Sequence, residues 1–118
     1  MHEINSSCEI ILEPQAKNTA PAIALAALNS KKNDMLFVLP ADHYIDDSDE
    51  FKRSYSEALS IAKENQLVTF GIYPTHPNTG YGYIKKGSNY KGAYNIDSFH
   101  EKPSLDNAVK FIDSGNFL

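Results

Sequence analysis

Cysteine and an excess of basic residues are what this sequence lacks most clearly. Its 118 residues contain one cysteine, Cys8, which excludes an internal disulfide and cannot build a zinc site by itself. A reducing cytoplasm is therefore the simplest compartment. There are 11 Lys and Arg against 15 Asp and Glu, which gives a net charge of −4. This balance argues against nucleic acid and against an anionic membrane surface as partners, because both select a basic face.

Long apolar runs are also missing. No stretch approaches the roughly 20 apolar residues that a membrane-spanning helix needs. Met1–Glu3 carries no cationic region followed by an apolar run, so no secretory signal is visible. The length suits one ordinary domain, and a hydrophobic content of 42% suffices for a core.

The first two thirds of the chain alternate between predicted strands and predicted helices. The strands are expected where short runs are apolar, and Met35–Leu39 is apolar at every position, as in a parallel strand buried on both faces. Thr19 and Ser48 are predicted helix caps. The predicted buried face of the second helix consists of apolar residues at helical spacing, namely Phe51, Tyr55, Ala58, Leu59 and Ala62. The expected order is strand Glu9–Leu12, helix Ala22–Leu28, strand Met35–Leu39, helix Ser48–Ala62 and strand Leu67–Ile72. This order indicates a doubly wound α/β sheet.

After Ile72 the pattern becomes richer in turns and strands. Tyr81–Lys86 and Asn95–Glu101 are predicted strands, and Gly87–Gly92 is a plausible hairpin connection between them. A helix capped at both ends is predicted over Ser104–Ser114, with Gly115 just beyond its last turn. We therefore expect a β-rich insertion after the α/β part.

Asp42 follows the predicted strand Met35–Leu39 and is a candidate metal ligand. Ligands of open α/β sheets bind outside the carboxyl ends of the strands, where this carboxylate lies. An oxygen ligand there suits Mg²⁺, which takes one or two carboxylates and completes its shell with phosphate and water. The alternative is structural, with Asp42 capping a turn and His43 bonding to backbone.

Glu101 and Lys102 form a second candidate site. Adjacent strand residues point to opposite faces, so the two side chains can share a pocket only where the strand ends. Pro103 enforces that end because it cannot donate to a ladder. A carboxylate could then accept sugar hydroxyls while the ammonium pairs with a phosphate. The alternative is a solvated surface ion pair, which stabilises little.

Two further segments are weaker candidates. Thr79–Tyr83 holds Gly80 and Gly82, which allow a ligand to approach the backbone closely, or which simply form a tight turn. Glu13–Ala20 leads into a helix whose N-terminal amides can receive an anion or a polar edge, although any capped helix looks similar.

In order and spacing, these segments resemble the bacterial mannose-1-phosphate guanylyltransferases, both stand-alone enzymes and those fused to a phosphomannose isomerase. The resemblance extends from about Ile11 to the C-terminus. The Asn18–Ala27 run separates this family from thymidylyl- and uridylyltransferase relatives. The runs that carry the resemblance are Asn18–Ala27, Leu39–His43, Val68–Ile72, Thr79–Ile84 and Phe99–Pro103.

The resemblance implies a fold, a reaction and a set of roles. The fold is the Rossmann-like, doubly wound mixed α/β sheet of sugar nucleotidyltransferases. The reaction is transfer of GMP from GTP to mannose 1-phosphate in the cytoplasm, giving GDP-mannose and pyrophosphate, and a homo-oligomer is compatible with it. The implied roles are Mg²⁺ binding for Asp42, mannose hydroxyls for Glu101, the sugar phosphate for Lys102, backbone contact with the sugar for Gly82, and the guanine for Glu13, Asn18 and Thr19.

Departures from the family concern single positions and whole motifs. Lys17 stands where arginine is usual, which removes a planar fork, Ala16 replaces glycine, and His100 replaces valine. The family's glycine-rich triphosphate loop, its Asn-Ser-Gly segment and its second metal aspartate are absent from these residues. We therefore expect residues 1–118 to be a partial nucleotidyltransferase domain, truncated at both ends and inactive alone. The alternatives are a non-catalytic sugar-nucleotide-binding or regulatory module, or a sister enzyme that uses another sugar phosphate.

Overall fold

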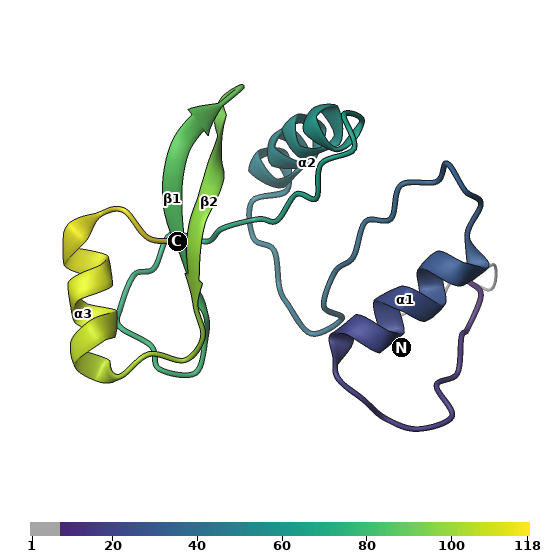
Figure 1. The fold of residues 1–118 in the computed structure, drawn as a ribbon, viewed down its shortest axis with the longest axis horizontal. Coiled ribbons are helices and arrows are strands. Elements are labelled where there is room, and N and C mark those ends of the chain that lie inside the picture. Colours follow the sequence, from purple (N-terminus) through teal and green to yellow (C-terminus); the bar gives the residue numbers. More distant parts are fainter. Residues whose placement is uncertain (1–7) are drawn as a thin grey trace. The chain divides into compact units, whose positions relative to one another are not determined.

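The computed structural model describes residues 8–118 and divides the chain into two compact units, Met1–Asp46 and Asp47–Leu118. The first unit contains helix α1 (Thr19–Asn29). The second contains α2 (Ser48–Ala62), β1 (Tyr83–Tyr90), β2 (Ala93–His100) and α3 (Leu105–Ser114), as Figure 1 shows. Within the described range, no helix is long and apolar enough to cross a membrane.

Helix α1 begins at Thr19, the residue that was predicted to cap it. Asn18 is the N-cap and Thr19 is already helical, so the prediction that Thr19 caps this helix was wrong. The side chain of Asn18 makes no capping hydrogen bond. Pro21 lies in the first turn, where its missing N–H has no helical partner to lose. The first turn is therefore not closed by any side chain.

The predicted strands Glu9–Leu12, Met35–Leu39 and Leu67–Ile72 form no ladder within residues 8–118. None of the three segments is a helix or a strand in the structure, and the five residues of Met35–Leu39 are between 41% and 49% exposed. The physical reason is that a parallel strand obtains its hydrogen bonds from partners distant in sequence. An apolar pattern indicates where a strand can form but does not supply its partner.

Helix α2 shows the predicted apolar face with a different cap. Asp47, not the predicted Ser48, is the N-cap, and its carboxylate accepts from the backbone N–H groups of Asp49 and Glu50 at 3.0 and 2.9 Å. The predicted face residues are all half-buried, and Ile61 beside them is 7% exposed. Those face residues are Phe51, Tyr55, Ala58, Leu59 and Ala62.

Strands β1 and β2 form an antiparallel hairpin with a two-residue turn. Tyr90 pairs with Ala93, and Lys91 and Gly92 between them have φ values of 52° and 89°. Two positive φ values in a two-residue loop describe a type I′ turn, which matches the twist of the strands. The predicted connection over Gly87–Gly92 was therefore too long, because residues up to Tyr90 belong to β1.

The second edge of β1 pairs with the end of the chain. Ile84 exchanges two backbone hydrogen bonds with Leu118, at 2.8 and 2.9 Å, and Lys86 donates to Asn116. Helix α3 starts at the predicted cap, Ser104, and ends at Gly115 with φ of 66°. These contacts hold the helix and the C-terminal segment around the hairpin.

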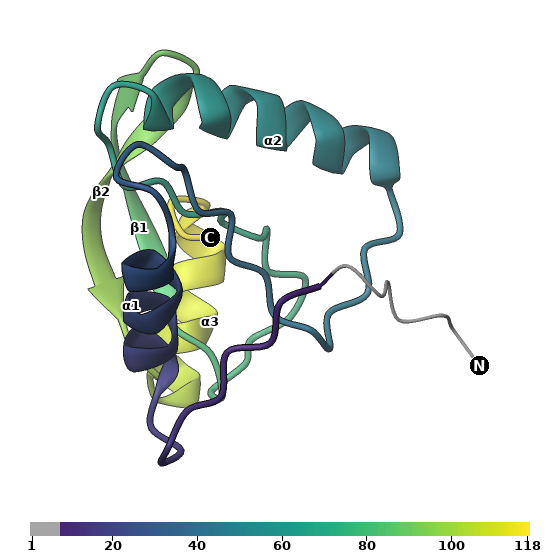
Figure 2. The same ribbon diagram turned by 90° about the vertical axis from the view of Figure 1, so that its right-hand side faces the viewer.

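An aromatic cluster joins α3 to the hairpin. The rings of Phe111 and Phe117 stack at 4.1 Å, and His100 lies 4.9 Å from Phe111. Tyr83, which is 3% exposed, packs against Phe111 at 5.6 Å. Helix α3 lies beside the hairpin in both views (Figures 1 and 2). This packing fixes the end of β2, where the predicted sugar-phosphate residues begin.

Candidate functional site

Strand β2 ends directly before Glu101 and Lys102. Its last residue is His100, three positions before Pro103, so the predicted strand end is present. Lys102 has a φ of 44°, in the left-handed region, and its N–H donates to the carbonyl of Tyr81 at 3.2 Å. Non-glycine residues in this region are uncommon and store strain, often at functional positions. The left-handed turn ends the alternation of faces that would otherwise separate the two side chains.

Gly82, Phe99, Glu101 and Lys102 form what we call the β2-end cluster. A Cβ at Gly82 would lie 2.1 Å from Cζ of Phe99 and 3.1 Å from Oε2 of Glu101. The missing side chain of Gly82 therefore leaves room for an aromatic ring and a carboxylate to approach its backbone. Gly82 directly precedes β1 and Glu101 directly follows β2. The hairpin thus brings together these two residues, which were predicted to bind the sugar.

The charged groups of the β2-end cluster face solvent. Nζ of Lys102 lies 3.6 Å from Oε1 of Glu101, and their side chains are 64% and 59% exposed. An exposed pair at this distance is also what the surface ion-pair interpretation predicts. That interpretation does not account for the approach of both the Phe99 ring and the Glu101 carboxylate to Gly82. The arrangement offers two acceptor oxygens, one cation and one aromatic ring at a single position.

The loop before β1 is a turn that places Gly82. The amide N–H of Gly80 donates to Oδ1 of Asn78 at 2.7 Å, and that of Asn78 donates to the Tyr83 hydroxyl at 2.9 Å. Neither Gly80 nor Gly82 has a positive φ. The turn interpretation of Thr79–Tyr83 is therefore correct for its geometry, and what requires glycine at position 82 is the close approach of Phe99.

Asp42 lies in a turn of the first unit, after Met35–Leu39, and is exposed. Its side chain makes no hydrogen bond or ion pair with any residue from 8 to 118, and the same holds for His43. The capping role considered for Asp42 is thus not observed. No group of three or more His, Cys, Asp or Glu in that range could hold a metal. A single open carboxylate fits Mg²⁺, because phosphate and water supply most of its shell.

Glu13 lines a hollow of about 410 Å³ against helix α1. Lys17 borders the same hollow, and the apolar side of the helix closes it through Pro21, Ala24, Leu25 and Leu28. The other two predicted nucleotide residues, Asn18 and Thr19, do not line it. They stand at the start of α1, where the first-turn amides are not capped by a side chain. Glu13 and the first turn of α1 nevertheless border the same hollow, through Pro21.

Phe99 is the residue of this site that received no role from the sequence. Phe99 is 59% exposed, and its ring lies nearest to the point where a Cβ of Gly82 would stand. The available signal was its spacing, because residues two apart on a strand share a face and Phe99 precedes Glu101 by two. The left-handed conformation of Lys102 carried no signal, since lysine is not a residue expected there.

The chain is similar to known nucleotidyltransferases over most of its length. A solved structure described as mannose-6-phosphate isomerase from Helicobacter pylori is 44% identical, with a TM-score of 0.80, over 90% of this chain and 40% of that chain. A mannose-1-phosphate guanylyltransferase from Salmonella montevideo is 48% identical over 95% of this chain and 26% of its own length. The xanthan biosynthesis protein XanB of Xanthomonas campestris is also 48% identical, over 92% of this chain and 24% of its own length.

These similarities confirm the predicted nucleotidyltransferase-type α/β fold. The chain spans about a quarter of the length of the curated relatives that it matches. The family model for nucleotidyl transferases matches residues 2–118, nearly the entire sequence. The chain therefore belongs to the nucleotidyl transferase family.

Proposed function

We propose that this chain contributes the sugar-phosphate site and a metal ligand to a mannose-1-phosphate guanylyltransferase in the cytoplasm. In this reaction an oxygen of mannose 1-phosphate attacks the α-phosphorus of GTP, and pyrophosphate leaves. The products are GDP-mannose, a precursor for polysaccharides of the kind named for the Xanthomonas relative, and pyrophosphate. The observation that carries the proposal is the convergence of Gly82, Glu101 and Lys102 in the β2-end cluster.

The chemistry of the β2-end cluster suits a sugar phosphate. The carboxylate of Glu101 offers two acceptor oxygens, which can receive hydrogen bonds from two sugar hydroxyls. The ammonium of Lys102, already within 3.6 Å of that carboxylate, supplies the positive charge for the phosphate. Gly82 would contact the sugar through its backbone. Binding in this orientation presents the phosphate oxygen for attack, and phosphoryl-type transfer depends mainly on such positioning.

Asp42 would hold Mg²⁺ through its open carboxylate, and Glu13, Asn18 and Thr19 would contact the guanine. When bound, Mg²⁺ neutralises negative charge on the GTP phosphates. The hollow at Glu13 and the uncapped first turn of α1 supply acceptor and donor groups suited to the edge of a purine. These assignments concern the first unit only, whereas the sugar-phosphate assignments concern the second.

The test is formation of GDP-mannose by the complete gene product that contains these residues. GTP, mannose 1-phosphate and Mg²⁺ are supplied, and the product and pyrophosphate are measured. GTP turnover with mannose 1-phosphate supports the proposal. Turnover only with another sugar phosphate would indicate a sister nucleotidyltransferase, and binding of GDP-mannose without turnover would indicate a non-catalytic module. Either result would overturn the proposed activity.

A further inference from the structure

We propose that Phe99 is the platform on which the pyranose ring of the sugar phosphate stacks, and that it determines specificity among sugars. The inference rests on the proposed function, because it takes a sugar phosphate as the ligand of the β2-end cluster. It adds an apolar contact to the carboxylate, the ammonium and the backbone group that the proposed function assigns to the sugar phosphate.

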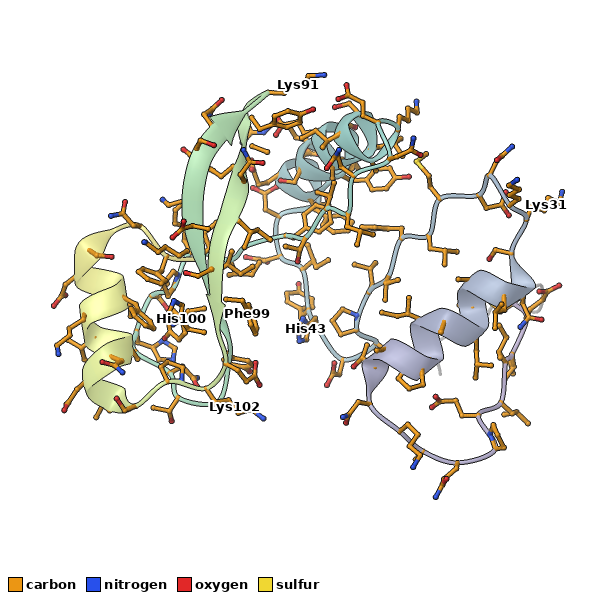
Figure 3. All side chains as sticks on the ribbon, in the orientation of Figure 1. Lys31, His43, Lys91, Phe99, His100 and Lys102 are labelled. Atoms are coloured by element: carbon orange, nitrogen blue, oxygen red, sulfur yellow. The ribbon has the colours of Figure 1, made fainter. Side chains whose placement is uncertain are left out.

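Phe99 points to the face of β2 opposite to that of His100. Strand residues alternate between faces, and His100 faces α3, where its ring lies 4.9 Å from Phe111. Ser98 belongs to the same face and contacts Nε2 of His100 through its hydroxyl at 3.0 Å. Figure 3 shows Phe99 on the opposite side of β2 from His100. Phe99 is therefore excluded from the aromatic cluster that stabilises this part of the chain.

The side chain of Phe99 is exposed to solvent and is also held in a fixed position. Phe99 is 59% exposed, but one edge of its ring lies over Gly82, where an added Cβ would be 2.1 Å from Cζ and 2.6 Å from Cε2. Its strand position is also held, because Phe99 pairs with Ile84 across the hairpin. An aromatic ring that is anchored at one edge and otherwise open offers contact area at low entropic cost.

Charged groups lie near the exposed ring of Phe99. Oε2 of Glu101 lies 3.1 Å from the same point above Gly82 that Phe99 approaches, and the Lys102 ammonium lies beyond that carboxylate. Ligand sites typically combine apolar or aromatic walls with a few convergent polar groups. A pyranose has C–H groups on its faces and hydroxyls around its rim. The ring of Phe99 suits the face, Glu101 suits the rim, and Lys102 suits the phosphate.

This arrangement implies selectivity between epimers. A sugar with a hydroxyl directed onto the ring would have to desolvate that hydroxyl against an apolar surface without a hydrogen bond. The alternative is that Phe99 only fills the space left by Gly82. In that case the ring would affect stability and leave substrate choice unchanged.

The experiment compares Phe99→Leu, Phe99→Tyr and Tyr94→Leu in the complete gene product that contains these residues. Tyr94 is the matched control, because it is an exposed aromatic on the same strand outside the β2-end cluster. KM is measured for mannose 1-phosphate, glucose 1-phosphate and GTP, together with kcat and the melting temperature of each variant.

Loss of an aromatic contact should raise the KM for mannose 1-phosphate by about two- to tenfold in Phe99→Leu. In the same variant the KM for GTP should stay constant, and the preference for mannose 1-phosphate over glucose 1-phosphate should fall. Phe99→Tyr should show the wild-type KM for mannose 1-phosphate and the wild-type preference. Tyr94→Leu should change neither KM. An unchanged KM for mannose 1-phosphate in Phe99→Leu, or equal increases in the KM for mannose 1-phosphate and the KM for GTP, would overturn the inference while leaving the proposed function standing. A wild-type protein with no GDP-mannose synthesis would instead overturn the proposed function and this inference with it.

Discussion

The two units of this chain contain apolar segments of similar character that reach different degrees of order. In the second unit, β1 and β2 form a closed hairpin, and all three buried core residues in the described range, Ile61, Tyr83 and Ala108, belong to this unit. In the first unit, Met35–Leu39 is more uniformly apolar than β1 or β2, yet its residues are 41–49% exposed. The difference follows from where the partners lie. A hairpin finds its partner two residues away, whereas a parallel strand needs a distant one.

The same difference separates the two groups of predicted site residues. Gly82, Glu101 and Lys102 follow or precede hairpin strands, and their mutual distances are set by local hydrogen bonds. Asp42 follows Met35–Leu39, which is not one of the strands that residues 8–118 form. The proposed sugar-phosphate residues are therefore positioned by local structure, while the position of the proposed metal ligand depends on how Met35–Leu39 is paired.

The largest expected effect is on stability. Tyr83→Ala should lower the free energy of unfolding by about 3–5 kcal/mol, because it removes a buried ring and leaves the Asn78 N–H without its acceptor. Leu36→Ala, at a position 42% exposed, should cost less than about 1 kcal/mol. Urea denaturation of both variants measures the difference. Equal losses would mean that the first unit is as well packed as the second.

Removal of the proposed metal ligand should have the next largest effect. Asp42→Asn keeps the shape of the side chain and loses the charge, so turnover at limiting Mg²⁺ should fall by about 100-fold or more. Asp46→Asn is the matched control, since Asp46 is another exposed aspartate of the same unit. Steady-state rates across a Mg²⁺ titration distinguish the two. Near-normal turnover in Asp42→Asn would leave Asp42 with a structural role.

Loss of the phosphate cation should be somewhat smaller. Lys102→Ala should raise the KM for mannose 1-phosphate by about ten- to a hundredfold, the value of one charge-assisted contact. Lys110→Ala, which removes an exposed lysine of α3, should leave this KM unchanged. Kinetics with each substrate varied in turn provide the measurement. An increase confined to the KM for GTP would assign Lys102 to the nucleotide.

The smallest effect concerns the contact between α2's end and the hairpin turn. Hydrogen bonds from Lys91 and then from Tyr90 lower the pKa of Glu64 below its usual 4.5. A lowered carboxyl pKa stabilises the fold above pH 4.5, and this contribution disappears as the pH falls through the folded-state value. Glu64→Gln should therefore lower the melting temperature slightly at neutral pH and not at all in acid.

The control for this comparison is Glu57→Gln, on helix α2 and outside the Glu64 contact. Melting curves of the wild type, Glu64→Gln and Glu57→Gln are measured from pH 3 to pH 7. They show whether the loss of melting temperature in Glu64→Gln is confined to the upper part of this pH range. A pH-independent difference would mean that Glu64 acts through packing. The effect should be small because the pair is exposed.

Sequence and structure agree best where a prediction depended on local chemistry. Ser104 and Gly115 were expected to bound α3 and do so, because capping involves groups a few residues apart. The caps of α1 and α2 were each predicted one residue late. Asp47 precedes Ser48 and accepts two backbone N–H groups, whereas Asn18 precedes Thr19 without a side-chain capping bond. The hairpin turn was located only broadly, because Lys91 gives no sign of its positive φ.

The sequence by itself determined the family, the end of β2 before Pro103 and the residue types available to a sugar phosphate, because these depend on local order and spacing. Only the tertiary structure decided which of those residues meet. The approach of Phe99 to Gly82 requires the register of β1 against β2, and the pairing of Glu101 with Lys102 requires a left-handed turn at a lysine. Register and backbone handedness arise from contacts across the hairpin, which no single segment of the chain specifies.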